Sequence, residues 1–199
     1  KNNTNNHIRK IITDAKRRKK LRKKLSTLEP DSGSPLKGKI LLQMFEKASS
    51  RTRISFYLAI KQLGGGTLTL RSNELHVGQG GESIADTAKI LSTYGDGFML
   101  RTDSDKKVEN FAKYLSIPVI NGLSPSSHPT QVLSDVFTVE EIKKKPISKL
   151  NICWIGDSNN VLDSLIAASV KFSFKLSIGC PKKFEPGKEV RAWVKRNNK

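Results

Sequence analysis

The sequence predicts an α/β protein with a parallel sheet covered by helices. Short apolar runs with the length of buried strands alternate with amphipathic helical patterns, and the links between them are short. This alternation is typical of β-α repetition, in which each strand returns to the same sheet through a helix. We therefore expect a parallel four-stranded sheet flanked by helices, followed by an incomplete second α/β domain.

The N-terminal segment is strongly basic. The 199 residues carry a net charge of +18 with an apolar fraction of 36%, enough for a packed core in one large or two small domains. Much of this charge lies in Lys16–Lys24, which is predicted to be the solvated face of a helix. Nucleic acid is not expected as a partner, because no helix-turn-helix, zinc-finger or RNA-binding sheet signature is present. The apolar stripe of this predicted N-terminal helix consists of Ile8, Ile11, Ile12, Ala15 and Leu21.

The elements of the first half follow a polar, turn-rich link at Glu29–Pro35. Gly64–Gly66 ends the expected helix Arg51–Leu63 and starts the expected strand Thr67–Leu70, since glycine adopts the backbone conformations that a helix end requires. A loop is expected over Arg71–Glu82, and Pro129 suits the first turn of a helix. The expected strands are Ile40–Phe45, Thr67–Leu70, Gly97–Leu100 and Pro118–Ile120, and the expected helices are Arg51–Leu63, Ser83–Tyr94, Lys106–Leu115 and Pro129–Thr138.

The second half begins after a charged segment with a proline, Glu140–Ser148, which is predicted to link two domains, residues 1–145 and residues 146–199. Two parallel strands and a helix bury too little apolar surface to be stable alone, so we expect this second domain to be incomplete. Its expected elements are the strands Asn151–Ile155 and Lys175–Ile178 and the helices Asn159–Phe172 and Lys188–Arg196.

Cys153 and Cys180 are the two cysteines. Both lie in or beside apolar runs without His or Cys at metal-ligand spacing, so they are predicted to be buried thiols in a reducing cytosol, and no metal is expected. No apolar run approaches the roughly 20 residues of a membrane span, and no signal peptide is evident. We expect a cytoplasmic protein without a membrane partner.

The segment Ser49-Ser50-Arg51-Thr52-Arg53 joins the first strand to its helix. A helix N-terminus offers free backbone N–H groups and the positive end of the helix dipole, and arginine matches phosphate oxygens two at a time. One interpretation is therefore a site for a phosphate-bearing ligand. The alternative is a serine N-cap followed by two solvated arginines, and this segment alone supports both equally.

Two other polar segments follow later strands. Arg101 comes after the third strand, and His128-Pro129-Thr130-Gln131 comes after the fourth. Ligands of parallel α/β sheets bind at the carboxyl ends of the strands, so we expect these segments and Ser49–Arg53 to converge on one crevice. Taken singly, Arg101, His128 and Gln131 could each be a solvated surface residue, and Asn159-Asn160 could simply cap a helix.

These motifs resemble the ornithine carbamoyltransferase family. Ser-x-Arg-Thr-Arg and His-Pro-x-Gln mark carbamoyltransferases generally, whereas Phe-Glu-Lys and Gly-Asp-x-Asn-Asn favour the ornithine enzymes over the aspartate enzymes. The resemblance runs from about Ile8 to the end of the chain. The segments that carry it are Phe45–Arg53, Glu82–Ala88, His128–Gln131 and Gly156–Val161.

The resemblance implies carbamoyl transfer from carbamoyl phosphate to the side-chain amine of L-ornithine, giving L-citrulline and phosphate, in arginine biosynthesis or catabolism. It implies no cofactor and no metal, and a homotrimer for the full-length chain. Fixed donors would stabilise the negative charge that grows on the carbonyl oxygen. The donors implied as catalytic are Arg101, His128 and Thr52.

The resemblance also implies individual binding roles. Ser49, Ser50, Arg51 and Thr52 would hold the phosphate, and Arg101 would bridge phosphate and carbonyl oxygens. His128 would donate to the carbonyl oxygen, Gln131 would hold the carbamoyl NH₂, and Asn160 would contact ornithine. His76 lies near the position that contacts carbamoyl phosphate from a neighbouring subunit.

The sequence departs from the family pattern in several places. Ser50 replaces the usual Thr, Ala48 replaces a common Pro, and the loop His76–Glu82 is one glycine longer than usual. The family's Ser-Met-Gly loop, His-Cys-Leu-Pro segment and late Arg do not occur in this sequence, as in a C-terminally truncated chain. We therefore expect little or no citrulline formation. The alternatives are a carbamoyltransferase with another amine acceptor and a non-catalytic basic fragment that binds anions or nucleic acid.

Overall fold

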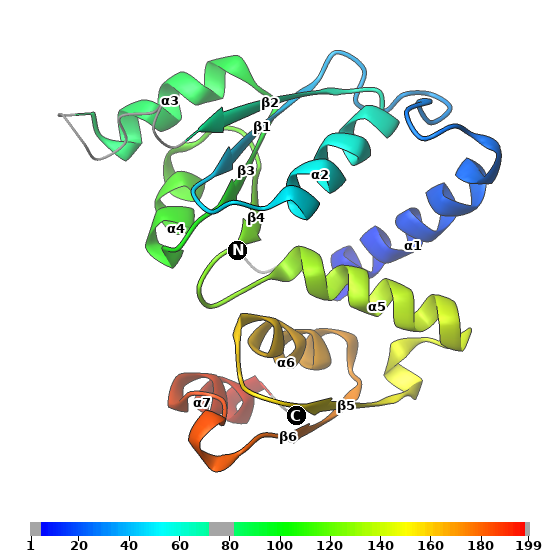
Figure 1. Cartoon of the computed structure of the whole chain (residues 1–199), viewed down its shortest axis with the longest axis vertical. Coiled ribbons are helices and arrows are strands. Elements are labelled where there is room, and N and C mark those ends of the chain that lie inside the picture. Colours follow the sequence, from blue (N-terminus) through cyan, green and yellow to red (C-terminus); the bar gives the residue numbers. More distant parts are fainter. Residues whose placement is uncertain (1–4, 72–81, 198–199) are drawn as a thin grey trace. The chain divides into compact units, whose positions relative to one another are not determined.

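The computed structural model describes residues 5–71 and 82–197, which belong to two compact units. Residues 18–125 form one unit, called here the four-stranded unit, and residues up to 17 together with residues from 126 onward form the two-stranded unit (Figure 1). Helix α1 (Asn5–Leu21) contributes residues to both. The domain boundary expected after residue 145 stays a prediction.

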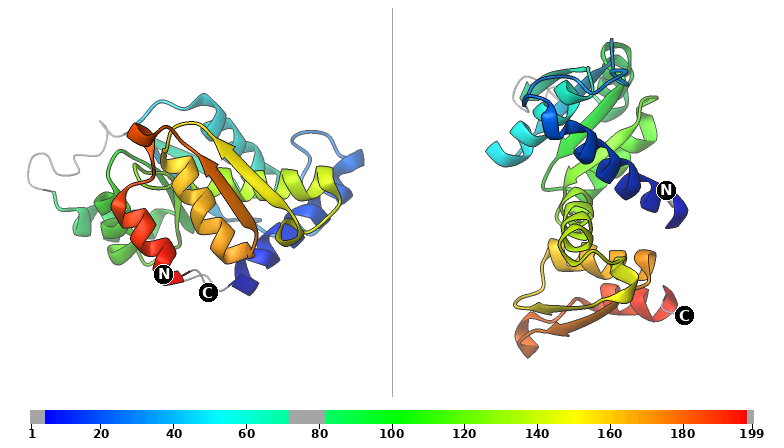
Figure 2. Two further views of the ribbon diagram at one scale, coloured as in Figure 1. Left: turned by 90° about the horizontal axis from the view of Figure 1, so that it is seen from below. Right: turned by 90° about the vertical axis from the view of Figure 1, so that its right-hand side faces the viewer.

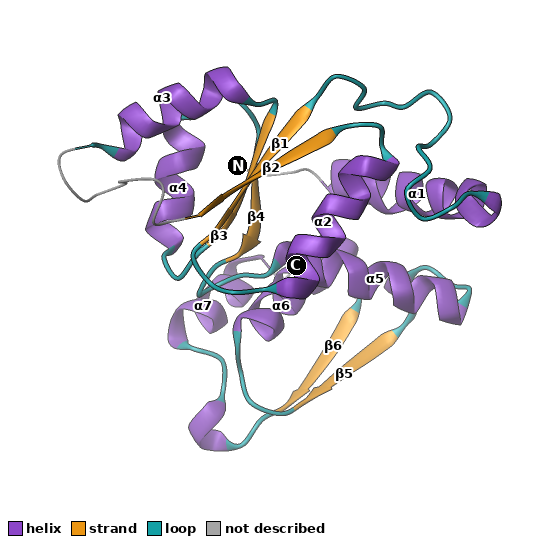
Figure 3. Ribbon diagram, turned by 45° about the horizontal axis from the view of Figure 1, so that its top comes forward, coloured by secondary structure: helices purple, strands orange, loops and turns teal. Residues whose placement is uncertain are grey.

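The four-stranded unit contains the predicted parallel sheet, which confirms the fold class. Its strand order is β2-β1-β3-β4, and every neighbouring pair is parallel. Figure 3 shows α3 and α4 on one side of this sheet and α2 on the other. The elements are η1 (Arg22–Lys24), β1 (Ile40–Phe45), α2 (Ser50–Gln62), β2 (Gly66–Arg71), α3 (Ile84–Tyr94), β3 (Gly97–Arg101), α4 (Asp105–Tyr114) and β4 (Val119–Leu123).

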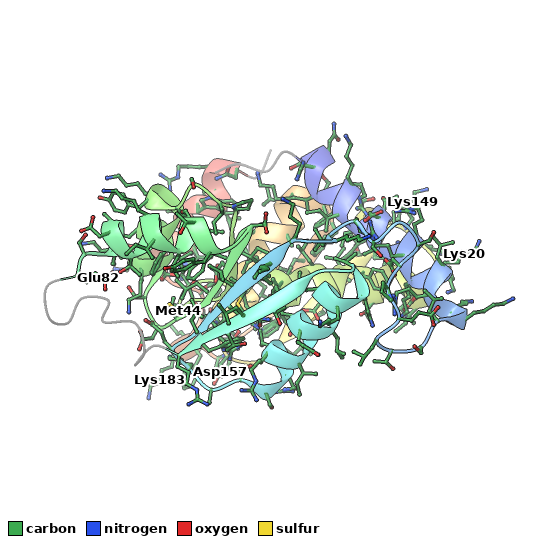
Figure 4. The ribbon with its side chains drawn as sticks, turned by 90° about the horizontal axis from the view of Figure 1, so that it is seen from above. Lys20, Met44, Glu82, Lys149, Asp157 and Lys183 are labelled. Carbon is green, nitrogen blue, oxygen red and sulfur yellow. The ribbon has the colours of Figure 1, made fainter. Side chains whose placement is uncertain are left out.

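Helices on both faces of the sheet explain why β1 is a nearly continuous apolar run. Residues 41 to 44 are all buried, because helices cover both faces of this parallel strand and exclude water from the side chains on each face. Figure 4 shows Met44 in the interior of this unit, whereas Lys20 projects from the surface at the end of α1. The core cluster consists of Leu42, Met44, Ala88, Leu91, Phe98, Leu100, Phe111 and Leu115.

The ends of the helices follow from local chemistry. The side chains of Ser83 and Ser104 accept hydrogen bonds from the first turns of α3 and α4, as serine N-caps do. Helix α2 ends at Gln62, two residues before Gly64. The φ of Gly64, +85°, is strained for other residues, and the N–H of Gly64 donates to the Lys61 carbonyl at 2.9 Å. Gly64 therefore stops the helix from continuing, as predicted.

The two-stranded unit is built around a parallel β5–β6 pair, and Figures 1 and 2 show α6 on one face of that pair. Its elements besides α1 are α5 (Pro129–Lys143), η2 (Ile147–Lys149), β5 (Asn151–Ile155), α6 (Asn160–Phe172), β6 (Lys175–Gly179), η3 (Lys182–Phe184) and α7 (Lys188–Asn197). Its core consists of Ile12, Val132, Val136, Ile147, Ala168, Phe172 and Phe174.

The prediction that Glu140–Ser148 is a link is wrong at its start. Helix α5 continues to Lys143, and Glu140 is only 4% exposed. Its carboxylate accepts hydrogen bonds from Arg9 Nη1 at 2.7 Å, from Lys16 Nζ at 2.6 Å and from the Ile147 N–H at 2.8 Å. A residue that looked like part of a solvated charge run therefore ties α1 to α5.

The predicted solvation of Lys16–Lys24 holds for Lys20 but is wrong for three members of the run. Besides Lys16, Arg18 and Arg22 donate to the two carboxylate oxygens of Asp31, at 2.9 and 2.5 Å. Burial by itself would raise the pKa of Asp31, but the hydrogen bonds and charges of the two arginines hold it below its ordinary value. These two arginines fold the turn-rich segment against the helix end.

The prediction of two buried thiols is also wrong. Alternate residues of β5 point to opposite faces, and Ile152 packs with the core on the α6 side. Cys153 therefore lies on the other face and is exposed, as is Ile155, at 86%. Cys180 is half-buried, and its thiol donates to the Gly156 carbonyl at 2.8 Å. Apolar neighbours in sequence did not predict burial, because the exposed residues of β5 face away from α6.

Over residues 5–71 and 82–197, none of the helices has both the length and the apolar composition needed to cross a membrane.

Candidate anion-binding site

The N-terminus of α2 combines hydroxyl groups with an arginine at the carboxyl end of β1. Ser49 is the N-cap, and its Oγ accepts the Thr52 N–H at 3.4 Å. Arg51 is exposed in the first turn, and Thr52 is half-buried. The serine N-cap expected in the alternative interpretation is therefore present. It also leaves Arg51 and the start of the helix open to a ligand, and a helix N-terminus attracts anions.

Arg101 joins this segment from the next strand of the sheet. It ends β3 and pairs in register with Phe45, the last residue of β1. Its Nη1 donates to Thr52 Oγ1 at 3.0 Å, so two segments far apart in sequence meet as the sequence predicts. The two residues that meet stand 49 positions apart in the chain.

The electrostatics of this edge favour an anion. Burial lowers the pKa of the half-buried Arg101, and the nearby positive charge of Arg51 lowers it further. The Nε of Arg101 is buried and has no hydrogen-bond partner within the part of the chain that the structure describes. Two cations thus share an edge with a helix N-terminus, and a phosphate group would neutralise both.

Glu46 stands in the Phe-Glu-Lys motif, which by itself assigns it no role. Its carboxylate accepts hydrogen bonds from Thr102 Oγ1 and from Lys107 Nζ, and its own N–H donates to the Arg101 carbonyl at 2.9 Å. The position of Glu46 directly after a buried strand was the available signal. Its partners could not be foreseen, because they lie 56 and 61 residues further along the chain.

In the two-stranded unit, Ser164 brings His128 and Asn160 together. The N–H of His128, the residue before α5, donates to Ser164 Oγ at 2.7 Å, and that hydroxyl donates to the Asn160 carbonyl at 2.7 Å. The His128 Nδ1 lies 3.4 Å from Thr130 Oγ1. Sequence reasoning missed Ser164, because a serine within an apolar helical pattern carries no signal of its partner.

The other two predicted positions have local partners. Gln131 is exposed and donates from Nε2 to Asp135 Oδ1 at 2.9 Å, as a solvated helix residue would. Asn159 caps α6, its Oδ1 accepting the N–H groups of Val161 and Leu162 at 2.9 and 3.2 Å. The capping interpretation is therefore confirmed for Asn159, and Asn160 is the first residue of the helix.

The predicted site residues divide between the two units. Ser49, Ser50, Arg51, Thr52 and Arg101 belong to the four-stranded unit, and His128, Gln131 and Asn160 to the two-stranded unit. The single crevice expected for all of them stays a prediction. His76 lies outside the described residues. Within residues 5–71 and 82–197, the structure contains no group of three or more His, Cys, Asp and Glu side chains placed to hold a metal ion.

A parallel α/β unit with a cationic helix N-terminus at the carboxyl edge of its sheet defines a class of domains suited to small anionic ligands. Within this class, the chain belongs to the aspartate/ornithine carbamoyltransferase family. Residues 1–141 match the family's carbamoyl-P binding domain, and residues 148–199 match its Asp/Orn binding domain.

Individual relatives agree with this assignment. The ornithine carbamoyltransferase of Rhizorhabdus wittichii is 43% identical over 185 residues, which cover 93% of this chain and 59% of the relative. The solved ornithine carbamoyltransferase of Pyrococcus furiosus superposes with a TM-score of 0.87 at 40% identity, covering 98% of this chain and 60% of that one. The Thermus thermophilus enzyme gives 0.85 at 31% identity, covering 98% of this chain and 63% of that one. The chain therefore spans about 60% of the length of these relatives.

Proposed function

We propose that the four-stranded unit binds carbamoyl phosphate at the N-terminus of α2. The observation that carries the proposal is the 3.0 Å hydrogen bond from Arg101 Nη1 to Thr52 Oγ1, which holds an arginine of β3 beside the first turn of α2. Ser49, Ser50, Arg51 and Thr52 are the proposed phosphate ligands. Arg101, which contacts this turn and pairs with the last residue of β1, is proposed to bridge the phosphate and carbonyl oxygens.

The proposed reaction is transfer of the carbamoyl group to the side-chain amine of L-ornithine, which gives L-citrulline and phosphate. The neutral amine attacks the carbonyl carbon, negative charge grows on the carbonyl oxygen, and the bond to the phosphate oxygen then breaks, the surplus proton of the amine leaving with the phosphate. Arg101, His128 and Thr52 are the proposed donors to that charge, and loss of one such donor typically costs on the order of 10²–10³ in rate. Phosphate leaves already neutralised by arginine.

The remaining roles are proposed from the family. Gln131 would hold the carbamoyl NH₂, and Asn160 would contact ornithine. In a homotrimer, His76 of one subunit would lie near the carbamoyl phosphate bound by the neighbouring subunit. Residues 1–145 would form the carbamoyl phosphate domain and residues 146–199 part of the ornithine domain. The setting would be arginine biosynthesis or catabolism in the cytoplasm.

We expect the 199-residue chain by itself to form little or no citrulline. The Ser-Met-Gly and His-Cys-Leu-Pro segments that complete ornithine binding in the family do not occur in its sequence. Binding of carbamoyl phosphate requires neither segment in this proposal. Binding of the first substrate and turnover are therefore separate questions, and normal turnover by the purified chain would contradict the second expectation.

The test is titration calorimetry of the chain with carbamoyl phosphate and with inorganic phosphate. Arg51→Ala should weaken both at least tenfold, because a hydrogen bond to a charged group contributes about 1.5–3 kcal/mol. Lys61→Ala is the matched control, since Lys61 is also exposed and its loss removes the same charge from the last turn of α2, at the other end of the helix. Unchanged affinity in Arg51→Ala, or an equal loss in both variants, would contradict the proposed phosphate site.

A further inference from the structure

Glu46 lies directly after β1 and connects three elements of the four-stranded unit. Its N–H continues the hydrogen bonding between β1 and β3 by one residue, donating to the Arg101 carbonyl at 2.9 Å. Beyond this point the sheet is irregular, because the β3–β4 register shifts between Leu100 and Arg101. The backbone of Arg101 therefore depends on Glu46 on one side at the position where its pairing on the other side is disturbed.

The side chain of Glu46 extends this connection to α4. One carboxylate oxygen accepts a hydrogen bond from Thr102 Oγ1, and the other accepts one from Lys107 Nζ at 2.5 Å. Thr102 is fully buried, and its hydroxyl oxygen accepts the Ser104 N–H at 3.2 Å. Ser104 in turn caps α4 by accepting the Lys107 N–H at 3.2 Å. The end of β3 and the first turn of α4 thus both depend on one carboxylate.

This arrangement differs from an ordinary surface ion pair, which contributes about 0–1 kcal/mol. The side chain of Glu46 is 12% exposed and that of Lys107 is 28% exposed. Each of the two carboxylate oxygens accepts a hydrogen bond from within the unit. The carboxylate of Glu46 binds Thr102 and Lys107. Glu46 itself lies three residues before the Ser49 cap and beside the backbone of Arg101.

We propose that Glu46 is a positioning residue of the anion site: through Thr102, Lys107 and the Arg101 carbonyl, it holds Arg101 in place against Thr52. The proposal rests on the proposed function, because it concerns the same site. Arg101 must stay beside Arg51 despite their mutual repulsion, and the Glu46 contacts hold its strand end there. A displacement of a binding group by about 1 Å is enough to cost large factors in function.

The first experiment measures carbamoyl phosphate and inorganic phosphate affinity by calorimetry in Glu46→Ala, Glu46→Gln and Asp31→Ala. Glu46→Ala should bind roughly tenfold more weakly or worse, and Glu46→Gln, which keeps an acceptor oxygen for Thr102, should recover part of the loss. Asp31→Ala is the matched control, since the Asp31 side chain, 10% exposed, is about as buried as that of Glu46 and also pairs with cations in the same unit. Its stability should fall while its affinity stays unchanged. Equal weakening in both alanine variants would overturn the proposal.

A double-mutant cycle separates positioning from a general structural effect. If Glu46 acts through Arg101, Glu46→Ala should add almost nothing to the affinity loss of Arg101→Ala. Additive losses would overturn the proposal.

A readout without ligand keeps this inference distinct from the proposed function. The Nε proton of Arg101, assigned by its disappearance in Arg101→Lys, should exchange with solvent at least tenfold faster in Glu46→Ala than in wild type or Asp31→Ala. Unchanged exchange would overturn the positioning role even if the site binds anions. Failure of the wild-type chain to bind either anion would instead contradict the proposed function.

Discussion

Ser164 and His128 are joined by a hydrogen bond of 2.7 Å from the backbone N–H of His128 to the Ser164 hydroxyl, which fixes the start of α5 against α6. Ser164→Ala removes this acceptor and should lower the free energy of unfolding by about 1–2 kcal/mol, because the N–H is then left without its partner. Urea denaturation measures the change. Ser169→Ala is the control, since its hydroxyl donates only within α6, to the Ile166 carbonyl at 2.7 Å. An equal loss in both variants would contradict the bridging role.

Gln43 should be a source of instability at the centre of the sheet. It is fully buried in β1, and neither atom of its amide has a hydrogen-bond partner within residues 5–71 and 82–197. Gln43→Met keeps a similar shape without a polar group and should raise the free energy of unfolding by about 1–3 kcal/mol. Gln62→Met should bring no gain, because the Gln62 amide donates to the Thr27 carbonyl at 3.0 Å. Destabilisation by Gln43→Met in the same urea experiment would show that the amide is satisfied.

Glu140 should make stability depend on pH in the acid range. Burial alone would raise its pKa, but the hydrogen bonds from Lys16, the Ile147 N–H and Arg9 outweigh burial and hold the pKa below the ordinary 4.5. Because the folded pKa is the lower one, Glu140 stabilises the protein above about pH 4.5, and this contribution is lost as the pH falls through the folded pKa.

Unfolding of the wild type and of Glu140→Gln, measured between pH 7 and pH 3, checks this expectation. The wild type should be more stable at pH 7 by on the order of 1–3 kcal/mol, and the difference should shrink below pH 4.5. Glu189→Gln, an exposed glutamate of α7, should show no such difference. A gap that stays constant down to pH 3 would rule out the ion-paired carboxylate as its cause.

The two thiols should differ in reactivity. Cys153 is exposed, whereas burial, followed by the negative charges of Asp157 and Glu185, raises the pKa of Cys180. Since the thiolate is the reactive form, a disulfide reagent at pH 8 should label Cys153 first. The fast phase should vanish in Cys153→Ser and remain in Cys180→Ser. The reverse pattern would show that Cys180 is the more reactive thiol.

Most of the secondary structure could be predicted because its signals are local. Strand β1 has the predicted bounds, and α6 starts one residue later than expected because Asn159 stands outside it as the cap. The predicted end of the helix that starts at Pro129 was five residues short, because Glu140 and Glu141 look like solvent-facing charge. Whether a carboxylate faces water depends on cations more than 120 residues away, which a local pattern does not contain.

The candidate site divides in the same way. The Ser49 cap and the position of Arg101 at a strand end follow from residue type and alternation, and their meeting follows from parallel topology. Glu46 and Ser164 could not be assigned, because their partners lie far away in the chain, 56 and 61 residues from Glu46 and 36 residues from Ser164. Cys153 was misjudged since its face of β5 is set by where α6 packs.

Because the guanidinium groups of Arg51 and Arg101 are neighbours, the measured stability of this chain should depend on the anion of the buffer. Burial lowers the pKa of Arg101, and the positive charge of Arg51 lowers it further, so the two guanidinium groups repel each other. Under the proposed function an anion relieves that repulsion, and a ligand at a hundred times its Kd stabilises a folded chain by about 2.7 kcal/mol. A melting temperature taken in phosphate then belongs to a complex, and one taken at equal ionic strength in a zwitterionic buffer belongs to the free protein.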